Sequence, residues 1–404
     1  MKNIKVGILK ETKTPPDKRV VLSPNEAKTL TEQFPNVELY IQKSENRCFR
    51  DEEYAELGLN LVDSVDHCDI LMGVKEVKIE ALIPNKKYLF FSHTAKEQEY
   101  NKPLLKALLN KKIQIIDHEY LTDENGARLV AFGRWAGLVG AYNGLLAYGL
   151  KTKSYQLKRA NACHDLEELK IELNKVKLDP VKILITGGGR VAHGAMEILN
   201  EIDGIEKVTA QQFLKKEFDH PVYCQIDPWH YLERNDGLPF DFKYFVKHPC
   251  KHTSTFKPYT KVTDLFIACH FWDEKSPVFM TNEDMLEDGF KINLIADVSC
   301  DIHGPIPSTI RPSTIAEPLY GYNAKTKQEV GAFDKEAVTV MAVDNLPGEL
   351  PRNASNDFGN GLLEKVFPSL FGEDDKGIIH RASITTLEGK LNDPFLYLED
   401  FLNQ

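Results

Sequence analysis

The chain has 404 residues, which at about 150 residues per domain favours two or three domains over one. Its composition is 42% hydrophobic and 27% charged, as in ordinary globular proteins, and this excludes a disordered or fibrous chain. Lysine and arginine total 50 against 60 aspartate and glutamate, so the net charge is -10. This acidic balance argues against nucleic acid or an anionic membrane as the main partner.

The cysteine pattern and one long apolar stretch bear on the cellular location. Seven scattered cysteines without a CxxC pair argue against a disulfide scaffold and a zinc site, so we expect no metal and a cytoplasmic protein. Residues 129–150 are long enough to span a bilayer, but they carry Arg134, Asn143 and five glycines. We expect a buried helix with closely packed small residues there.

The first third of the chain alternates short apolar runs with helical patterns. One helix is predicted after Ser23, a capping residue followed by Pro24. Another is predicted over 95–112, although Pro103 is unfavourable inside a helix. Such alternation predicts a parallel α/β sheet. The strands we predict here are Lys5–Glu11, Val37–Gln42, Ile70–Lys75, Lys87–His93 and Gln114–Leu121.

A second set of strands follows the glycine-rich stretch and a polar segment. Residues 211–263 are rich in Pro, His, Lys and aromatics without a clear period, so we interpret them as an insertion. The basic part at 243–261 has the composition of a nucleic-acid patch, but the acidic total favours a solvated, partly folded excursion. The strands we predict are Val181–Thr186, Lys207–Ala210, Asp264–Cys269, Lys291–Val298 and Val338–Val343.

The strongest local motif lies at 181–202, where a buried strand ends in three glycines and a helix starts at once. Gly187 permits the tight turn, and Gly189 lets backbone N–H groups approach a pyrophosphate at the helix N-terminus. A plain strand-to-helix turn uses the same residues, but the α/β context favours a dinucleotide site. The acid expected about 20 residues further on, for the ribose, is missing, and Thr209 stands in that neighbourhood. The choice between NAD and NADP therefore stays open, and Lys215 and Lys216 offer charge for a 2′-phosphate.

Ionisable residues stand at the ends of the predicted strands in the first third of the chain. Lys75 and His93 end two strands, and Asp117, His118 and Glu119 lie toward the end of the strand predicted over 114–121. Ligands collect beyond the carboxyl ends of strands in an open α/β sheet. Alone, each residue has an ordinary interpretation as a surface lysine or a capping histidine. Together with a dinucleotide turn they favour hydride transfer coupled to proton transfer at a C–N or C–O bond.

Several blocks then occur in order along the chain: GILKETKTPPDKRVVLSP, LMGVKE, FFSHTAKEQ, GARLVAFGRWAGLVGAY, ITGGGRVAHGA, IADVSCDIHG and VDNLPGELPRNASNDFGNGL. Together they resemble the lysine-forming saccharopine dehydrogenases and the lysine–ketoglutarate reductase half of the bifunctional lysine-degrading enzyme, within the alanine dehydrogenase and transhydrogenase superfamily. The resemblance implies two Rossmann-like α/β domains with parallel sheets and an active-site cleft between them. Residues 1–133 with 344–404 would form the substrate domain, and residues 134–343 the dinucleotide domain.

The resemblance also implies the activity and the roles of individual residues. The reaction is the reversible cleavage of saccharopine to lysine and 2-oxoglutarate with NAD or NADP. Lys75 would be the base that takes the amine proton, His93 the acid–base for water addition to the imine, and Glu119 the carboxylate that pairs with the lysine. The implied substrate positions are Arg19, Lys96, Gln98, Arg128 and Phe132. The implied cofactor positions are Gly187, Gly189, Arg190, Val191, Thr209, Cys269, His270, Asp297, Val298, Ser299, Val343, Asp344, Asn345 and Leu346.

Two other interpretations stay open. An alanine dehydrogenase-like amino-acid dehydrogenase would share Lys75 and His93, but Arg128 and the block at 346–355 suit the additional carboxylates of saccharopine. A non-catalytic NAD-binding protein resembling a transhydrogenase subunit would not require these ionisable residues. We expect small-molecule substrates, no nucleic-acid or membrane partner, and a monomer or small homo-oligomer.

Overall fold

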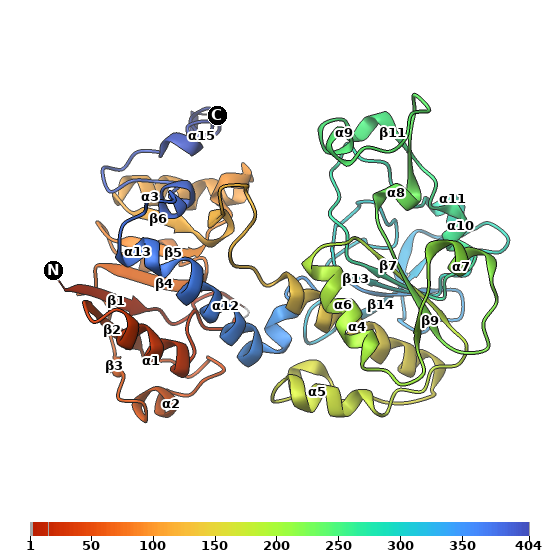
Figure 1. Cartoon of the computed structure of the whole chain (residues 1–404), viewed down its shortest axis with the longest axis horizontal. Coiled ribbons are helices and arrows are strands. Elements are labelled where there is room, and N and C mark those ends of the chain that lie inside the picture. Colours follow the sequence, from red (N-terminus) through yellow and green to blue (C-terminus); the bar gives the residue numbers. More distant parts are fainter. Residues whose placement is uncertain (1–2, 15, 404) are drawn as a thin grey trace. The chain divides into compact units, whose positions relative to one another are not determined.

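A computed structural model describes residues 3–14 and 16–403, and its chain divides into two compact units. Unit 1 comprises Met1–Phe132 and Pro351–Gln404, and unit 2 comprises Gly133–Leu350. In Figure 1 the C-terminal helices, drawn in blue, lie beside the first strands of the chain, drawn in red and orange. Unit 1 is therefore discontinuous in the sequence.

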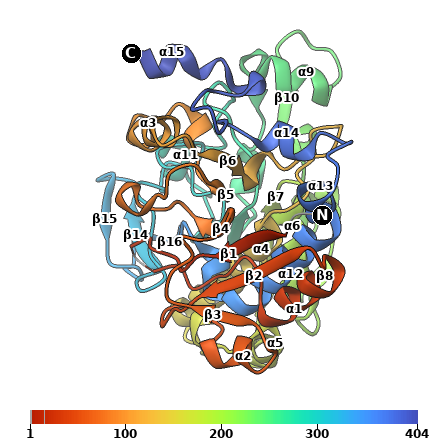
Figure 2. The same cartoon turned by 90° about the vertical axis from the view of Figure 1, so that its left-hand side faces the viewer.

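Unit 1 contains a six-stranded parallel sheet in the order β3-β2-β1-β4-β5-β6. Figure 2 shows the strands following one another in this order. The reversal of direction at β1 and β4 is typical of doubly wound α/β sheets, and it confirms the predicted fold class for this unit. The strands are β1 (Ile4–Ile8), β2 (Val37–Gln42), β3 (Asn60–Val62), β4 (Ile70–Lys75), β5 (Lys87–Phe91) and β6 (Gln114–Asp117).

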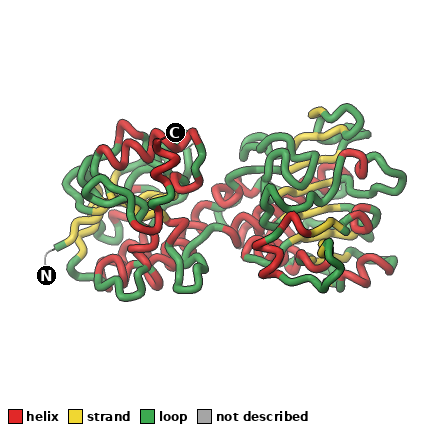
Figure 3. The backbone as a smooth tube through the Cα atoms, turned by 90° about the horizontal axis from the view of Figure 1, so that it is seen from above, coloured by secondary structure: helices red, strands yellow, loops and turns green. Residues whose placement is uncertain are grey.

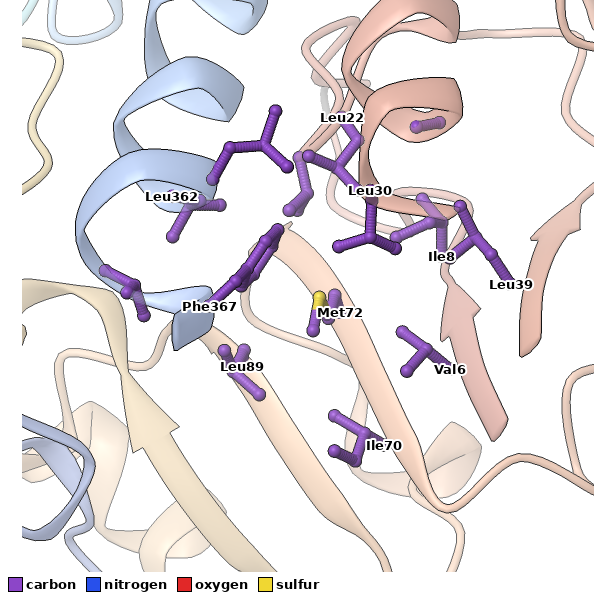
Figure 4. Close-up of a cluster of buried hydrophobic side chains, with 14 of the residues drawn as sticks. Val6, Ile8, Leu22, Leu30, Leu39, Ile70, Met72, Leu89, Leu362 and Phe367 are labelled. Carbon is purple, nitrogen blue, oxygen red and sulfur yellow. The ribbon is translucent and has the colours of Figure 1, made fainter. Parts of the chain in front are cut away.

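Both faces of this sheet are covered, and the C-terminal segment contributes to each. Figure 4 shows Met72 and Leu89 on one face, in contact with Leu362 and Phe367 of the C-terminal helices. On the other face the intervening strand residues pack against α3 and α15. The helices of unit 1 are α1 (Pro24–Gln33), α2 (Asp51–Ala55), α3 (Lys102–Asn110), α12 (Pro351–Lys365), α13 (Phe367–Phe371), α14 (Ile378–Ala382) and α15 (Leu398–Asn403).

Capping explains where two predicted elements of unit 1 begin and end. The strand predicted over 114–121 stops at Asp117, because its carboxylate accepts the N–H of Glu119 and starts a short turn. The helix predicted over 95–112 starts only at Lys102. Pro103 lies in its first turn, where no backbone donor is needed, so the proline begins the helix and does not interrupt it.

Unit 2 contains an eight-stranded sheet in the order β15-β14-β16-β13-β12-β7-β9-β8. Strands β16 to β8 are parallel, whereas β14 and β15 join antiparallel at one edge. Figure 3 distinguishes the strands from the surrounding helices and loops. The strands are β7 (Lys182–Thr186), β8 (Glu206–Lys207), β9 (Val222–Ile226), β12 (Leu265–Ala268), β13 (Leu294–Asp297), β14 (Leu319–Asn323), β15 (Gln328–Val330) and β16 (Val338–Met341).

Strand β9 corrects the prediction for residues 211–263. This strand lies beside β7 within the main sheet, so the interpretation of the whole stretch as an insertion is wrong for 222–226. The strand predicted at Lys207–Ala210 is also wrong beyond Lys207, because Thr209 caps helix α7. The local pattern of β9 is only five residues long and its flanks are rich in polar residues, which hid it.

The rest of that stretch is folded as a small arm. Strands β10 (Leu232–Arg234) and β11 (His252–Ser254) form an antiparallel pair, with helix α9 (Phe242–Lys247) between them. The other helices of unit 2 are α4 (Gly133–Thr152), α5 (Leu166–Leu173), α6 (Arg190–Asn200), α7 (Ala210–Lys215), α8 (Pro228–Tyr231), α10 (Lys257–Thr260) and α11 (Asn282–Met285).

The glycine-rich stretch forms α4, which is mostly buried and packs closely against α6. A Cβ on Gly137 would overlap the carbonyl of Val191, and one on Gly194 would overlap the carbonyl of Arg134. Gly137 and Gly194 therefore allow the close contact between the two helices. In the described part of the chain, no helix has both the length and the apolar character needed to cross a membrane.

Candidate functional site

In unit 1, the ionisable residues that we singled out come together at the carboxyl edge of the sheet. Glu11 follows β1, Lys75 ends β4, His93 follows β5 and Glu119 follows β6. Because β1, β4, β5 and β6 are adjacent and parallel, these ends lie along one edge. The edge therefore carries two groups of charged side chains, one around Lys75 and one around His93.

Side chains rather than neighbouring strands hold the backbone beneath Lys75. The pairing of β4 with β5 shifts register between Met72 and Lys75. Glu11 accepts the N–H groups of Val74 at 2.6 Å and Lys75 at 2.9 Å. The Nε2 of buried His118 donates to the Gly73 carbonyl at 3.0 Å. These bonds fix the direction in which the lysine leaves the strand.

The surroundings of Lys75 favour its neutral form. Burial lowers the pKa of its ammonium group, and the charges of Arg19 and Lys13 lower it further, while Asp17 and Glu76 oppose them. Burial also raises the pKa of Glu11 to about 7, against the two backbone hydrogen bonds. Such shifts are frequent where a protein uses proton transfer.

Arg19 lies in a buried pair with Asp17. Its Nε and a terminal nitrogen donate to the two carboxylate oxygens at 3.0 and 2.7 Å, and its guanidinium lies 4.2 Å from the centre of the Phe132 ring. Burial alone would raise the pKa of Asp17, but the hydrogen bond and charge of Arg19 lower it to about 2. Phe132 in turn stacks on Phe358 at 4.6 Å. Arg19 thus has a bidentate carboxylate partner within the protein.

The second group is built around Glu119. One carboxylate oxygen lies 2.5 Å from Arg128, and the other lies 3.1 Å from the Lys96 ammonium and 3.4 Å from His93 Nδ1. Burial raises the pKa of Glu119, but these partners outweigh it and lower the pKa to about 2. Glu119 is therefore a carboxylate at neutral pH, between a histidine and two cations.

This geometry corrects the partner predicted for Glu119. We expected it to pair with Lys75, but its ion pairs are with Arg128, Lys96 and His93. The strand order gives the reason, because β5 lies between β4 and β6, and the residue that follows β5 is His93. The carboxylates whose charges act on Lys75 are those of Asp17 and Glu76.

His93 itself occupies an unusual backbone conformation. Its φ is 56°, in the left-handed region that residues other than glycine seldom adopt. Buried Asp117 supports this turn by accepting the Ser92 N–H at 2.9 Å and its hydroxyl at 2.5 Å. The same carboxylate accepts the N–H of Glu119 at 2.8 Å. Asp117 thus ties together the two turns that carry His93 and Glu119, a role that its position in the sequence does not predict.

In the described part of the chain, Gln98, another predicted substrate residue, hydrogen-bonds to neither the residues around Lys75 nor those around Glu119. It is exposed, and its side-chain oxygen accepts from the hydroxyl of Tyr100 at 2.7 Å. The structure thus places Lys96 and Arg128 on Glu119, Phe132 on Arg19, and Gln98 in a surface turn.

In unit 2, β7 ends in the glycine turn and α6 begins at Arg190 and Val191. Gly187 has φ +91°, and a Cβ there would lie 2.6 Å from the Cys269 carbonyl, so only glycine fits. Gly189 precedes the helix, and a Cβ there would meet open space. Open space and oriented N–H groups at a helix N-terminus suit a phosphate group.

The acid that we missed in the sequence is Asp227. It directly follows β9, the neighbour of β7, and its carboxylate lies against Gly188 of the turn. Thr209 instead accepts the N–H of Gln212 as the cap of α7. Since a ribose-binding acid stands at the end of the second strand of a dinucleotide unit, Asp227 and not Thr209 has the expected position. The sequence does contain a signal for this acid, because Asp227 directly follows the short apolar run at 222–226.

A cavity of about 850 Å³ opens beside the glycine turn, wholly within unit 2. A cavity of this size, with a turn and an acid at one side, fits the ADP half of a dinucleotide. Of the predicted cofactor residues it includes Gly187, Gly189, Val191, Cys269 and His270. Its other lining residues are Gly188, Asp227, Pro228, Trp229, Tyr231, Phe242, Phe245, Val246, Pro249, Phe271, Asp273 and Ser276.

The remaining predicted cofactor residues follow β13 and β16 and have structural contacts. Asp297 accepts the Thr309 hydroxyl at 2.6 Å, and burial raises its pKa to about 6. The Ser299 hydroxyl donates to the His270 carbonyl at 2.6 Å. Val298 packs against Gly140 of α4. Val343 and Leu346 are buried, with Asp344 and Asn345 between them.

Comparisons with known proteins cover most of the chain. Residues 7–139 match the family described as alanine dehydrogenase/PNT, N-terminal domain. Mitochondrial alpha-aminoadipic semialdehyde synthase of Mus musculus is 28% identical over 95% of this chain and 46% of its own length. The chain thus spans about half the length of that relative. The NAD(+), L-lysine-forming saccharopine dehydrogenase of Schizosaccharomyces pombe is 25% identical over 90% of this chain and 92% of its own length.

Two solved structures share the fold. An L-alanine dehydrogenase superposes with a TM-score of 0.64 at 15% identity, covering 99% of this chain and 100% of that one. A transhydrogenase from Sinorhizobium meliloti superposes with a TM-score of 0.61 at 13% identity, covering 96% and 99%.

Proposed function

We propose that the chain is a lysine-forming saccharopine dehydrogenase that uses NAD, because residues 7–139 match the alanine dehydrogenase/PNT N-terminal family and 90% of the chain aligns with a saccharopine dehydrogenase over nearly its full length. It would interconvert saccharopine with lysine and 2-oxoglutarate. The observation that carries the proposal is the edge of the unit 1 sheet, which bears a desolvated lysine beside a histidine that contacts an ionised carboxylate. An oxidation at a C–N bond followed by hydrolysis needs two such acid–base groups.

Lys75 is the base in this proposal. In the oxidative direction it takes the proton of the secondary amine, which leaves a lone pair on nitrogen to expel the hydride from the adjoining carbon. NAD, when bound, accepts that hydride. Burial and the charges of Arg19 and Lys13 lower the pKa of Lys75, which favours the neutral amine that a base requires. Glu11 and His118 hold its backbone in place.

His93 is the acid–base group for the hydrolytic half of the reaction. It would take a proton from the water that adds to the imine and deliver one to the departing lysine amine as the carbinolamine collapses. Glu119, 3.4 Å from its Nδ1, accepts from that nitrogen when it is protonated and so orients the ring. Its left-handed backbone and the support of Asp117 keep the imidazole at this position.

The substrate carboxylates would bind the cations at the same edge. Lys96 and Arg128 both have side chains that are 40% or more exposed, so they are accessible although Glu119 aligns them. A guanidinium is well suited to a carboxylate. We withdraw Arg19 from this role, because it is buried in its bidentate pair with Asp17. Its proposed contribution is the positive charge that it places near Lys75.

The cofactor preference follows from Asp227. An acid at the end of this strand favours the two free hydroxyls of the NAD ribose and repels the 2′-phosphate of NADP. The residues that line the cavity in the described part of the chain include no lysine or arginine. Lys215 and Lys216 lie at the end of α7 and are not among its lining residues. We therefore propose NAD over NADP.

The proposal is tested by a substrate comparison. Purified protein should oxidise NADH when lysine and 2-oxoglutarate are both present, should not do so with either alone, and should oxidise NADPH at least tenfold more slowly. Oxidation with pyruvate and ammonia but not with lysine and 2-oxoglutarate would assign it as an alanine dehydrogenase-like enzyme. No oxidation with either pair would refute a dehydrogenase of this kind.

A further inference from the structure

Large apolar side chains line the outer part of the unit 2 cavity without being buried. Trp229 is 53% exposed, Phe242 54% and Val246 64%. All three line the cavity, Trp229 from α8 and the other two from α9 of the arm. Contiguous exposed apolar surface of this kind marks a binding site for a ligand or a partner.

The arm holds this apolar surface in a defined place. Its base is anchored by Tyr231 and Phe256, which are buried in the unit 2 core with ring centres 6.1 Å apart. Phe240 packs between α8 and α9, because its ring centre lies 6.4 Å from that of Trp229 and 5.8 Å from that of Phe245. At its N-terminus α9 is capped by Asp241, which accepts the Tyr244 N–H at 2.6 Å. The apolar surface is therefore part of a folded element rather than a loose loop.

The order of chemistry around the cavity matches the order of groups in an adenine dinucleotide. The glycine turn at 187–189 suits a pyrophosphate, and Asp227 beside Gly188 suits the ribose attached to it. Trp229 follows Asp227 by two residues in the same short helical turn. Whatever is attached to the ribose beyond Asp227 therefore meets Trp229 and the side chains of α9.

We propose that Trp229, Phe242 and Val246 form the binding wall for the adenine ring, so that the arm at 232–254 is a cofactor-binding element. The inference rests on the proposed function, since it places the adenine end of the NAD assumed there. Adenine is flat and apolar on its faces, and an indole can stack on it. Lys243 and Lys247 of α9 are not among the lining residues, so the wall itself offers no cation to a polyanion.

A protein partner is the competing occupant, and the cavity argues against it. The apolar residues share one hollow of about 850 Å³ with the glycine turn and Asp227, which is the volume of a small-molecule site. They do not form a separate flat face.

The test measures binding of ADP-ribose, which carries the adenine end without nicotinamide, by calorimetry. Trp229→Ala should weaken binding roughly tenfold, which corresponds to the loss of one aromatic stack. Trp229→Phe should restore most of the affinity, because it keeps an aromatic face. Val246→Ser should weaken binding about threefold. The matched control is Leu238→Ala, which removes an exposed leucine of the same arm that does not line the cavity, and it should bind as the wild type does.

A second readout separates this inference from the proposed function. With lysine, 2-oxoglutarate and NADH, the KM for NADH of Trp229→Ala should rise about tenfold, whereas that of the control Leu238→Ala should match the wild type. If wild-type protein uses NADH but Trp229→Ala binds ADP-ribose within twofold of the wild type, the adenine wall is wrong and the dehydrogenase stands. If the wild type binds neither ADP-ribose nor NADH, both proposals are wrong.

Discussion

The carboxyl edge of the sheet differs sharply between the two units. In unit 1 the strand ends carry ionisable side chains. Burial and the charges of Arg19 and Lys13 lower the pKa of Lys75. Burial raises the pKa of Glu119, but its histidine, lysine and arginine partners outweigh that effect and lower it. In unit 2 the residues that line the cavity include glycines, aromatic side chains and two acids, Asp227 and Asp273. In the proposed function, similar parallel topology therefore serves proton transfer in one unit and cofactor binding in the other.

This contrast predicts a separation of effects. Changes at the edge of unit 1 should alter the rate and its pH dependence while cofactor affinity stays the same. Changes around the unit 2 cavity should alter cofactor affinity while the maximal rate stays the same. Any variant that crosses this division would break the comparison.

The largest effect is expected for Lys75→Met. Removing the base should lower kcat by about a thousandfold, within the usual range for a general base, and leave the Kd for ADP-ribose unchanged. The control is Lys78→Met, an exposed lysine three residues further on, which should keep the wild-type rate. A kcat within tenfold of the wild type would contradict the assignment of Lys75.

The second variant is Asp227→Ser, which can still cap α8. Loss of the charged ribose contact should raise the KM for NADH by roughly 10–100-fold and leave kcat within twofold of the wild-type value. The ratio of kcat/KM for NADH to that for NADPH should decrease. Asp273→Ser removes the same charge from another lining residue and should change the KM little. Steady-state kinetics with both cofactors measure these effects, and an unchanged KM for Asp227→Ser would exclude the residue as ribose ligand.

Glu11 makes the unit 1 edge testable through the pH dependence of the free energy of unfolding. Burial raises its pKa to about 7 from the ordinary 4.5, so the folded state holds its proton more tightly than the unfolded state does. Its contribution to the free energy of unfolding is therefore fully present below pH 4.5 and is lost as pH rises through 7. Between pH 5 and 8 the loss should be about 2 kcal/mol.

Glu11→Gln should remove this dependence. Urea unfolding at several pH values should give a smaller decline from pH 5 to 8 than in the wild type, whatever the variant's stability at a single pH. Glu56→Gln, at an exposed position, should keep the wild-type slope. Equal slopes for Glu11→Gln and the wild type would show that Glu11 does not titrate in this range.

The smallest effect is expected for Glu119→Gln. The amide cannot balance the charges of Arg128 and Lys96 or accept as strongly from His93, so kcat should fall about tenfold while the KM for NADH stays constant. Glu124→Gln, a nearby exposed residue, should leave kcat unchanged. If Glu119→Gln raised only the KM for NADH, the division between the two edges would be contradicted.

Much of unit 1 could be predicted from the sequence because each relevant residue directly follows an apolar run. The runs ending at Lys75 and before His93 are long, buried and close to their observed bounds. The order of the strands in the sheet was not encoded in these local patterns. For that reason the predicted pairing of Glu119 with Lys75 was wrong. The partner of Glu119 depends on which strand lies next to β6, and that strand is β5.

Less of unit 2 could be predicted from the sequence, because β9, the strand that pairs with β7, lies within a polar stretch. Strand β9 is five residues long, and it lies further from the glycine turn than the usual spacing of about 20 residues between that turn and the ribose acid. That spacing points to Thr209, which instead caps α7. Backbone pairing with β7 is what reveals Asp227. The arm was likewise not predicted, because the contact that anchors its base joins rings far apart in the sequence, Tyr231 and Phe256.

The most direct test of the account follows the hydride itself. Protein is incubated with lysine, 2-oxoglutarate and NADH that carries deuterium at both positions of nicotinamide C4, and the products are analysed by mass spectrometry. We predict saccharopine with one deuterium in its glutaryl half, on the carbon bonded to the lysine nitrogen, and none from Lys75→Met. Deuterium in alanine after addition of pyruvate and ammonia, without labelled saccharopine, would contradict the account.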